Sequence, residues 1–186
     1  MSTKHEFQSL NNDTGPESEQ LADESTDSLI EAIQNGATLS DIQGVSDETM
    51  KGIYKLAYDF YHQGKLNDAE SLFRFLSIYD FYNAEYVMGL AAVYQLKNNY
   101  AKAIELYALA YTISKNDFRP MFYAGQCNLM LRQVVQANKC FEIIVARCHD
   151  KELVKKAKLY IAALDEMQTS IETKDKTEDK TEAEGI

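Results

Sequence analysis

Three histidines and three cysteines are the side chains of this 186-residue chain best suited to metal binding or nucleophilic chemistry. Cys140, Cys148 and His149 lie closest together in the sequence. Thiolates and imidazoles are ligands that zinc prefers, but this group offers only three ligands, at a spacing that matches no common zinc pattern. Cys140 also belongs to an apolar helical pattern with Ala137 and Ile144, which favours a core position. The sequence therefore predicts no metal site.

Motifs for catalysis or cofactor binding are also missing. His5 and His62 lie far from the cysteines, and the chain has no P-loop, glycine-rich phosphate cradle or nucleophile elbow. The acidic pair Asp47 and Glu48 falls at the start of a helical pattern, where carboxylates interact favourably with the helix dipole. We expect neither enzymatic activity nor a cofactor.

The composition is typical of one helical domain. Hydrophobic residues make up 45% of the chain, whereas glycine and proline number only 8 and 2, which argues against a turn-rich β fold. No stretch approaches the roughly 18 apolar residues of a membrane-spanning helix, and the polar first residues do not resemble a signal peptide. An odd number of cysteines without a CxxC pair predicts reduced, buried thiols in a cytosolic protein.

The net charge of −10 is concentrated at the two ends of the chain. Residues 1–27 carry seven acidic side chains against one lysine, and residues 165–186 carry eight against three, which leaves +1 for residues 28–164. An acidic field disfavours binding to nucleic acid, and no basic stripe with interleaved aromatic residues offsets it. We therefore expect no direct nucleic-acid partner.

A constant period organises the middle of the chain. Ala69, Ala103 and Ala137 are equally spaced, and each is followed one helical turn later by an aromatic residue. The aromatic residues are Phe73, Tyr107 and Phe141. The spacing from Ala69 to Ala103, called the repeat period below, also relates three segments, 50–83, 84–117 and 118–151. Each has the pattern of two amphipathic helices whose small residues allow close approach. Several positions that agree in register form the tetratricopeptide pattern.

Further helices are expected on both sides of the repeats. A first helix over 27–34 lies within an N-terminal helical segment, 25–49. A last amphipathic helix, 150–168, should cap the exposed end of the solenoid, which terminal repeats require. Residues 1–24 and 169–186 are acidic and poor in apolar side chains, so both tails are predicted to be disordered. The predicted fold is all-α: a tetratricopeptide solenoid of three helix pairs with an N-terminal helix and a C-terminal capping helix.

Nine outward-facing positions form the predicted binding groove. Because the first helix of each pair lines the concave face of such a solenoid, the fifth, ninth and twelfth residues of each repeat face the groove. These residues are Tyr54, Tyr58, Tyr61, Met88, Ala92, Gln95, Phe122, Gln126 and Leu129. They include no arginine or lysine, so they suit apolar side chains of an extended peptide rather than an acidic peptide terminus. The alternative is that single residues of this set pack on neighbouring repeats.

Several stretches of the chain resemble a known protein family. The run from Gly36 to Ile42, GATLSDI, and the run from Tyr54 to Tyr61, YKLAYDFY, resemble the class II chaperones of type III secretion systems. The block FRFLSIYDFYN, which begins at Phe73, resembles the same family. The likeness covers about residues 29–164 and is nearest to the invasion-system members.

The resemblance implies a bacterial cytoplasmic chaperone that binds the major and minor translocator proteins and keeps them soluble and apart before export. The N-terminal segment of the client would lie extended in the concave groove, where Tyr54 and Tyr58 match groove tyrosines. Family members form homodimers through the N-terminal helix or the first repeat, which makes Leu29, Ile30 and Ile33 the expected dimer contact. The alternative that the resemblance permits is a transcriptional co-regulator that partners an AraC-type activator.

Overall fold

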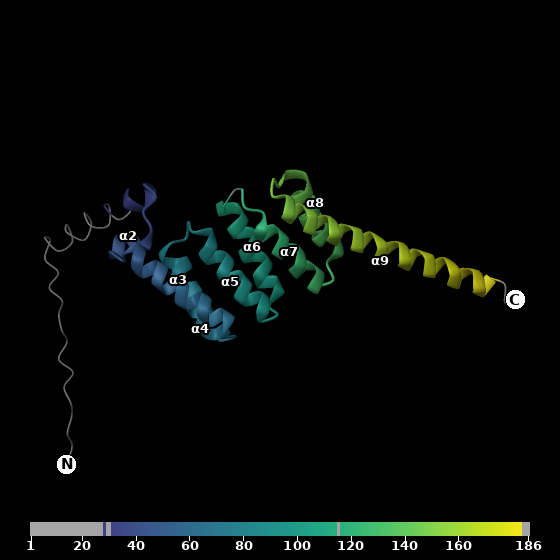
Figure 1. Cartoon of the computed structure of the whole chain (residues 1–186), viewed down its shortest axis with the longest axis horizontal. Helices are drawn as coiled ribbons and strands as arrows, with labels where there is room; N and C mark the ends of the chain where they lie inside the picture. The colour runs from purple at the N-terminus through teal and green to yellow at the C-terminus, as the bar shows by residue number, and fades with distance from the viewer. Residues whose placement is uncertain (1–27, 29–30, 115, 184–186) are drawn as a thin grey trace, which may run out of the picture.

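Short turns divide the chain into consecutive α-helices that stack side by side (Figure 1). The computed structural model describes residues 28, 31–114 and 116–183, with the backbone alone for residues 168–183. The helices are α2 (Leu39–Gln43), α3 (Asp47–His62), α4 (Leu66–Tyr79), α5 (Ala84–Leu96), α6 (Tyr100–Ser114), α7 (Arg119–Met130), α8 (Val134–Arg147) and α9 (Lys151–Ala183). The described residues form no β-strand, and none of their helices has the length and apolar character that a bilayer crossing demands.

The helices pair as the repeat period predicts. α3 and α4 form the first repeat, α5 and α6 the second, and α7 and α8 the third, and each helix packs against the next along the chain. The side chains of Thr38, Ser46 and Asn83 cap α2, α3 and α5 by accepting hydrogen bonds from backbone N–H groups of the first turn. Pro120 lies in the first turn of α7, where its missing N–H costs no helical hydrogen bond.

The turn inside each repeat has the same backbone geometry. Gly64, Asn98 and Arg132, each one repeat period from the next, have φ angles of 72°, 60° and 58°. This left-handed conformation is free of strain for glycine and tolerable for asparagine, but it costs most other residues roughly 1 kcal/mol or more. The third turn therefore carries backbone strain that the first two largely avoid.

Each repeat has an aromatic ring buried among small residues. Phe73, Tyr107 and Phe141 are at most 1% exposed. Five alanines on the facing positions are completely buried: Ala57, Ala69, Ala91, Ala103 and Ala137. At Gly125 of α7 not even a methyl group fits, because an added Cβ would lie 2.7 Å from the Phe141 ring. The small residues therefore set how closely the helices approach.

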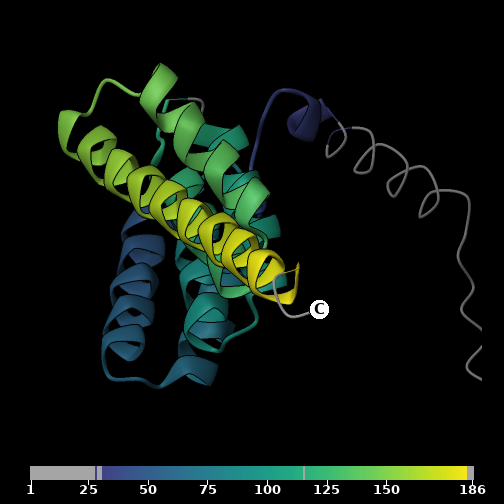
Figure 2. The same cartoon turned by 90° about the vertical axis from the view of Figure 1, so that its right-hand side faces the viewer.

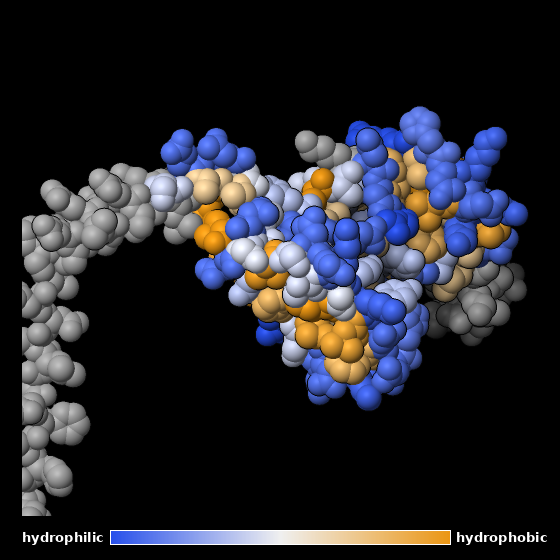
Figure 3. Space-filling view, turned by 60° about the vertical axis from the view of Figure 1, so that its left-hand side comes forward, coloured by the Kyte–Doolittle hydropathy of each residue, from blue (hydrophilic) through white to orange (hydrophobic). Residues whose placement is uncertain are grey.

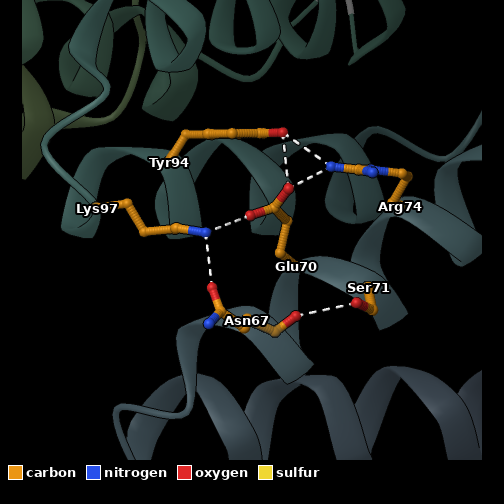
Figure 4. A network of polar contacts seen from close by, with 6 residues as sticks. All are labelled: Asn67, Glu70, Ser71, Arg74, Tyr94 and Lys97. Atoms are coloured by element: carbon orange, nitrogen blue, oxygen red, sulfur yellow. Dashed lines mark hydrogen bonds and ion pairs between the residues drawn. The ribbon is translucent and has the colours of Figure 1, made fainter.

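Glu70 on α4 ties the first repeat to the second (Figure 4). Its carboxylate accepts hydrogen bonds from Tyr94 Oη at 2.9 Å and Lys97 Nζ at 2.6 Å, and it pairs with Arg74 one turn further along α4. Lys97 Nζ also donates to Asn67 Oδ1 at 2.9 Å. The hydrogen bond from Lys97, with help from Tyr94, lowers the pKa of Glu70 below its ordinary value. The folded state therefore favours the ionised carboxylate.

The third repeat has no counterpart of this network. Asn128 stands where the second repeat has Tyr94, and its side chain is buried. Its Nδ2 donates to the backbone carbonyl of Ala124 at 2.8 Å, which satisfies the amide within α7 itself. The break in the repeat pattern is thus accommodated by a local hydrogen bond.

α9 covers the end of the stack and then continues past it (Figures 1 and 2). The side chains of α9 that pack in the apolar cluster of the last helix pair are Leu153, Val154, Ala157, Tyr160, Ile161 and Leu164. The sequence-based prediction ended this helix at residue 168 and left 169–186 disordered, whereas the structure continues the helix to Ala183. Residues 151–183 contain no glycine or proline, so a helix nucleated by the cap meets no backbone signal that stops it.

The N-terminal segment is described only in part. Residues 31–34 are helical, and the chain turns at Gly36 with a φ of 89°. Ile33 is 48% exposed. Leu29 and Ile30, the other two residues of the expected dimer contact, lie outside the described residues, as does the predicted tail 1–24.

Gly125→Ala should lower the stability of the fold by about 1–3 kcal/mol, because the added methyl group overlaps the Phe141 ring. Gly52 on the exposed side of α3 is the matched control, since no neighbouring atom lies within 4 Å of its Cβ position. Gly52→Ala should be neutral or stabilising by up to about 1 kcal/mol through helix propensity. Thermal unfolding followed by circular dichroism measures both variants, and equal shifts would contradict the packing argument.

Glu70→Gln should lower stability near neutral pH and have a shrinking effect as the pH is lowered. Because the pKa of folded Glu70 is lowered, its contribution is fully present above the ordinary glutamate pKa of about 4.3 and is lost as pH falls through the lowered value. Urea unfolding of both proteins over the acidic range measures the difference. The exposed Asp59 on α3 supplies a control, Asp59→Asn. A gap that stays constant with pH would show that the charge of Glu70 does not matter.

Candidate peptide-binding site

Three tyrosines on α3 form one wall of a hollow between the first helices of the repeats. Tyr54, Tyr58 and Tyr61 lie on one helix face, with ring centroids 6.3 Å apart for the first pair and 6.5 Å for the second. Tyr54 also meets the Phe73 ring edge-on at 5.9 Å, which anchors the wall to the core of the first repeat. Tyr58 is 49% exposed, so its ring is available to a ligand.

Met88, Ala92 and Gln95 on α5 line the other side of the same hollow, which has a volume of about 390 Å³. The structure thus brings together six of the nine residues predicted for the groove. Gly89 forms part of the floor: an added Cβ would lie 2.3 Å from the Phe73 ring, so the ring occupies the space that a side chain would need. The volume falls in the range of about 300–1,000 Å³ that is common for ligand sites.

The hollow is lined by polar groups as well as by rings and aliphatic side chains, and the partners of these polar groups define their roles. Tyr107 Oη donates to Gln95 Oε1 at 2.7 Å, which leaves the NH₂ group of Gln95 as the part available to a ligand. Burial raises the pKa of both Tyr54 and Tyr61, so their hydroxyls stay protonated at neutral pH and can donate hydrogen bonds. Aromatic and aliphatic walls that also carry hydrogen-bond donors suit a peptide that inserts apolar side chains and presents backbone carbonyls.

A charged rim borders the hollow at residues outside the nine predicted positions. Arg119 at the start of α7 pairs with Glu85 of α5, and its Nε donates to Asp117 Oδ2 at 2.9 Å. The hydrogen bond to Asp117 chiefly, and that to Glu85, raise the pKa of Arg119. The hollow therefore has a basic residue at its edge, unlike the predicted groove. Because two carboxylates already balance that charge, Arg119 is not a ready clamp for the carboxylate of an acidic peptide.

The repeat spacing could have revealed the rim. Glu85 and Arg119 are one repeat period apart and so occupy equivalent places on neighbouring first helices. Tyr123, another residue that lines the hollow, is one repeat period from Gly89. The second and sixth positions of a repeat therefore face the hollow together with the fifth, ninth and twelfth. The prediction considered only the latter three.

The other three predicted groove residues lie at the junction of α7 with α9. Phe122 is 7% exposed, and its ring meets that of Tyr160 at 5.5 Å. Gln126 Nε2 donates to Tyr160 Oη at 2.8 Å. Leu129 packs in the same apolar cluster. The structure does not bring Phe122, Gln126 and Leu129 into the hollow. They contact neighbouring residues of the fold instead, which is the alternative considered for single groove residues.

The side chains considered for metal binding or nucleophilic chemistry are dispersed. Cys127, Cys140 and Cys148 are free thiols. Cys127 is fully buried, and burial raises its pKa to about 11, which keeps the thiol protonated and unreactive. Cys140 and Cys148 are partly exposed, so the prediction of buried thiols holds fully for Cys127 alone. In the part of the chain that the structure describes, no group of His, Cys, Asp and Glu side chains could hold a metal ion.

Sequence comparison relates the chain to secretion chaperones. The tetratricopeptide repeat family matches residues 50–83 and 84–117, the bounds predicted for the first two repeats. Chaperone protein SicA of Salmonella typhimurium is 50% identical over 139 residues, which are 75% of this chain and 84% of SicA.

Solved structures of similar fold come from the same class of proteins. SycD of Yersinia enterocolitica, a type III secretion translocator chaperone, superposes with a TM-score of 0.63 at 27% identity, over 69% of this chain and 98% of SycD. PcrH of Pseudomonas aeruginosa, solved with the chaperone binding region of PopD, gives a TM-score of 0.62 at 28% identity, over 67% and 97% of the two chains. The chain therefore belongs to the tetratricopeptide-repeat translocator chaperones of type III secretion, is of the SicA type, and is not an enzyme.

Proposed function

We propose that the chain binds the chaperone-binding segments of translocator proteins in the hollow between α3 and α5. The client segment lies extended and inserts apolar side chains between the tyrosine wall and Met88, Ala92 and Gln95. Binding takes place in the bacterial cytoplasm, before export. The client is thereby kept soluble, and the two translocators are kept apart.

The lining of the hollow is the observation that carries this proposal. Rings and aliphatic groups on two neighbouring first helices leave about 390 Å³ open to solvent, with Tyr58 half exposed. Exposed aromatic and aliphatic side chains gathered in one hollow often mark a binding site, and aromatic side chains give large contact areas at low entropic cost. Extended peptides with spaced apolar side chains are the partners that such a surface fits.

The solved relatives support the choice of client. SycD has been solved with a peptide of the translocator YopD, and PcrH with the chaperone binding regions of PopD and PopB. Segments of translocators are thus the clients to test first. No feature of the described residues favours the second function that the family resemblance permits, a co-regulator for an AraC-type activator, so it is not proposed.

A client is protected because its most apolar side chains are hidden while it waits for export. Each buried apolar side chain contributes on the order of 1.5–3 kcal/mol relative to exposure. The burial of two or three such side chains offsets part of the entropic cost of ordering the client segment. The contacts remain noncovalent, and the client can therefore be released to the secretion machinery.

Tyr58→Ala should weaken client binding by about 2 kcal/mol, roughly 30-fold in Kd, because it removes a half-exposed aromatic ring from the wall of the hollow. The chain offers a matched control in Tyr82, a tyrosine of similar exposure that does not line the hollow. Tyr82→Ala should bind as the parent does. Fluorescence anisotropy of a labelled N-terminal translocator segment from the same bacterium measures both.

The helical content of Tyr58→Ala should stay near that of the parent, since the ring is half exposed. Parental affinity in this variant would place the client on another surface. Weakening of the same size in Tyr82→Ala would show that the loss is not specific to the hollow.

We further infer that the client-free chain forms a homodimer through its N-terminal segment. Ile33 is 48% exposed on the segment before α2, and the sequence places Leu29 and Ile30 beside it. A symmetric pair would bury the same apolar residues of both subunits. SycD, the translocator chaperone described above, has been solved in an alternative dimer, which supports self-association as a property to test in this chain.

Ile33→Asp should convert the dimer to a monomer. The introduced carboxylate would be buried against the same segment of the second subunit, which is unfavourable. Light scattering measures the mass. Ile78, an isoleucine that is 55% exposed at the end of α4, supplies the control. Ile78→Asp should keep the mass of the parent. If Ile33→Asp stays dimeric, the contact lies elsewhere, with the first repeat as the next place to examine.

A further inference from the structure

The hollow between α3 and α5 exposes apolar side chains to water. Tyr58 on α3 and Leu96 on α5 both line it, and each is 49% exposed. Exposed aromatic and aliphatic side chains gain free energy when another apolar group covers them. Any apolar segment that the chain itself holds near the hollow can therefore compete with a client for it.

The sequence before Ser28 contains one stretch of suitable chemistry. Residues 1–10 read MSTKHEFQSL and carry one lysine and one glutamate, so their net charge is zero when histidine is neutral. Phe7 and Leu10 give this stretch two apolar side chains three residues apart. A polyproline-type extended chain has three residues per turn, so both side chains can enter the same hollow from one side of the backbone.

The rest of the N-terminal sequence is less suitable because of its charge. Residues 11–27 carry six acidic side chains and no basic one. The rim of the hollow also has an excess of negative charge, since Glu85 and Asp117 set two carboxylates against the one guanidinium of Arg119. Like charges repel, so the acidic stretch is disfavoured at the hollow and the neutral stretch is not.

The distance from Ser28 to the hollow has an upper limit set by the backbone. Two turns precede α3, at Gly36 and Gly44, and each is closed by a backbone hydrogen bond of 2.9 Å between residues five positions apart. Residues joined in this way have Cα atoms roughly 5–6 Å apart. The remaining path to Tyr54 consists of nine residue steps of about 3.4 Å and seven helical steps of about 1.5 Å. Ser28 and Tyr54 are therefore roughly 55 Å apart at most.

The tether between the neutral stretch and Ser28 is longer than this limit. Phe7 lies 21 residues before Ser28 and Leu10 lies 18 before it, which gives roughly 70 Å and 60 Å for an extended chain. Leu21 has a tether of only roughly 24 Å. A tether of about twenty residues holds its end at an effective concentration on the order of 1 mM. A contact with a Kd of about 0.2 mM would then fill the hollow in roughly five chains out of six.

We propose that residues 1–10 occupy the hollow of their own chain until a client displaces them. Phe7 and Leu10 insert between the tyrosine wall and Met88. Binding of a client is thereby coupled to release of the segment, which covers the apolar side chains in the client-free chain. The competition with the client rests on the function proposed above, whereas the position of Phe7 does not.

Photo-cross-linking locates Phe7 directly. A direct method is needed because hydrophobic side chains such as Val135 and Leu159 are exposed on other helices, and Figure 3 shows such side chains in patches on one face of the molecule. The full-length chain is made with p-benzoylphenylalanine in place of Phe7, irradiated without client and mapped by mass spectrometry. We expect cross-links to Met88 and to other lining residues of α3 and α5, all within one chain.

A variant of the wall shows whether this cross-link depends on the hollow. Tyr58→Ala should reduce the yield by about fivefold, because the weakened contact leaves the hollow mostly empty. Tyr82→Ala, outside the hollow, should leave the yield within about twofold. Cross-links confined to other helices would overturn the proposal. A cross-linked product of twice the mass would also contradict it, since a second copy would then supply the segment.

Client affinity tests the competition. Phe7→Ser combined with Leu10→Ser should tighten binding of the labelled translocator segment by about fivefold, since the hollow is no longer occupied. Gln8→Ser combined with Asn11→Ser changes neighbouring polar residues as a matched control and should stay within about twofold. If Tyr58→Ala weakens client binding but the first variant does not tighten it, the proposed competition is wrong. If Tyr58→Ala keeps the parental affinity, the proposed client site fails instead, and the cross-link alone decides the position of Phe7.

Discussion

The close approach of two helices around a buried aromatic ring is the contact on which the rest of the structure depends. Phe73, Tyr107 and Phe141 each fill the space that neighbouring alanines and glycines leave. Because this contact recurs once in every repeat, successive helix pairs meet in the same way and their first helices align on one side. The Phe73 ring, packed against Gly89, forms part of the floor of the hollow that Tyr54, Tyr58 and Tyr61 wall, called the tyrosine-walled hollow below. The same aromatic ring therefore contributes both to the core of the first repeat and to the lining of the binding surface.

The length of the open surface is set by α9. Tyr160 is one repeat period from Gln126, so α9 takes the position that the first helix of a fourth repeat would have. The cap uses Phe122 and Gln126 as its contacts, and the hollow ends at Tyr123 on the edge of the third repeat. A solenoid needs such a cap because its last helix pair would otherwise expose an apolar face. α9 therefore stabilises the C-terminal end of the solenoid but shortens the open binding surface.

The helix pairs and their register could be predicted from the sequence, because period, small residues and aromatic residues all specify the same contact. The place of Phe122 could not, since a ring in a groove and a ring under a cap have the same sequence pattern. The charged rim was missed because the prediction took only the fifth, ninth and twelfth positions of each repeat, whereas Glu85 and Arg119 occupy the second position of their repeats. The continuation of α9 to Ala183 was missed because the polar residues beyond 168 favour neither helix nor coil strongly.

The left-handed turn at Arg132 is a site at which we expect proteases to cleave the chain. This residue is exposed, lies in the α7–α8 turn between Met130 and Val134, and holds a backbone conformation that most side chains disfavour. Exposed, strained turns are the places where chains are most readily nicked, and an arginine there is a substrate for trypsin-like enzymes. A cut after Arg132 would separate α8 and α9 from α3 to α7. All residues of the tyrosine-walled hollow would remain on one fragment.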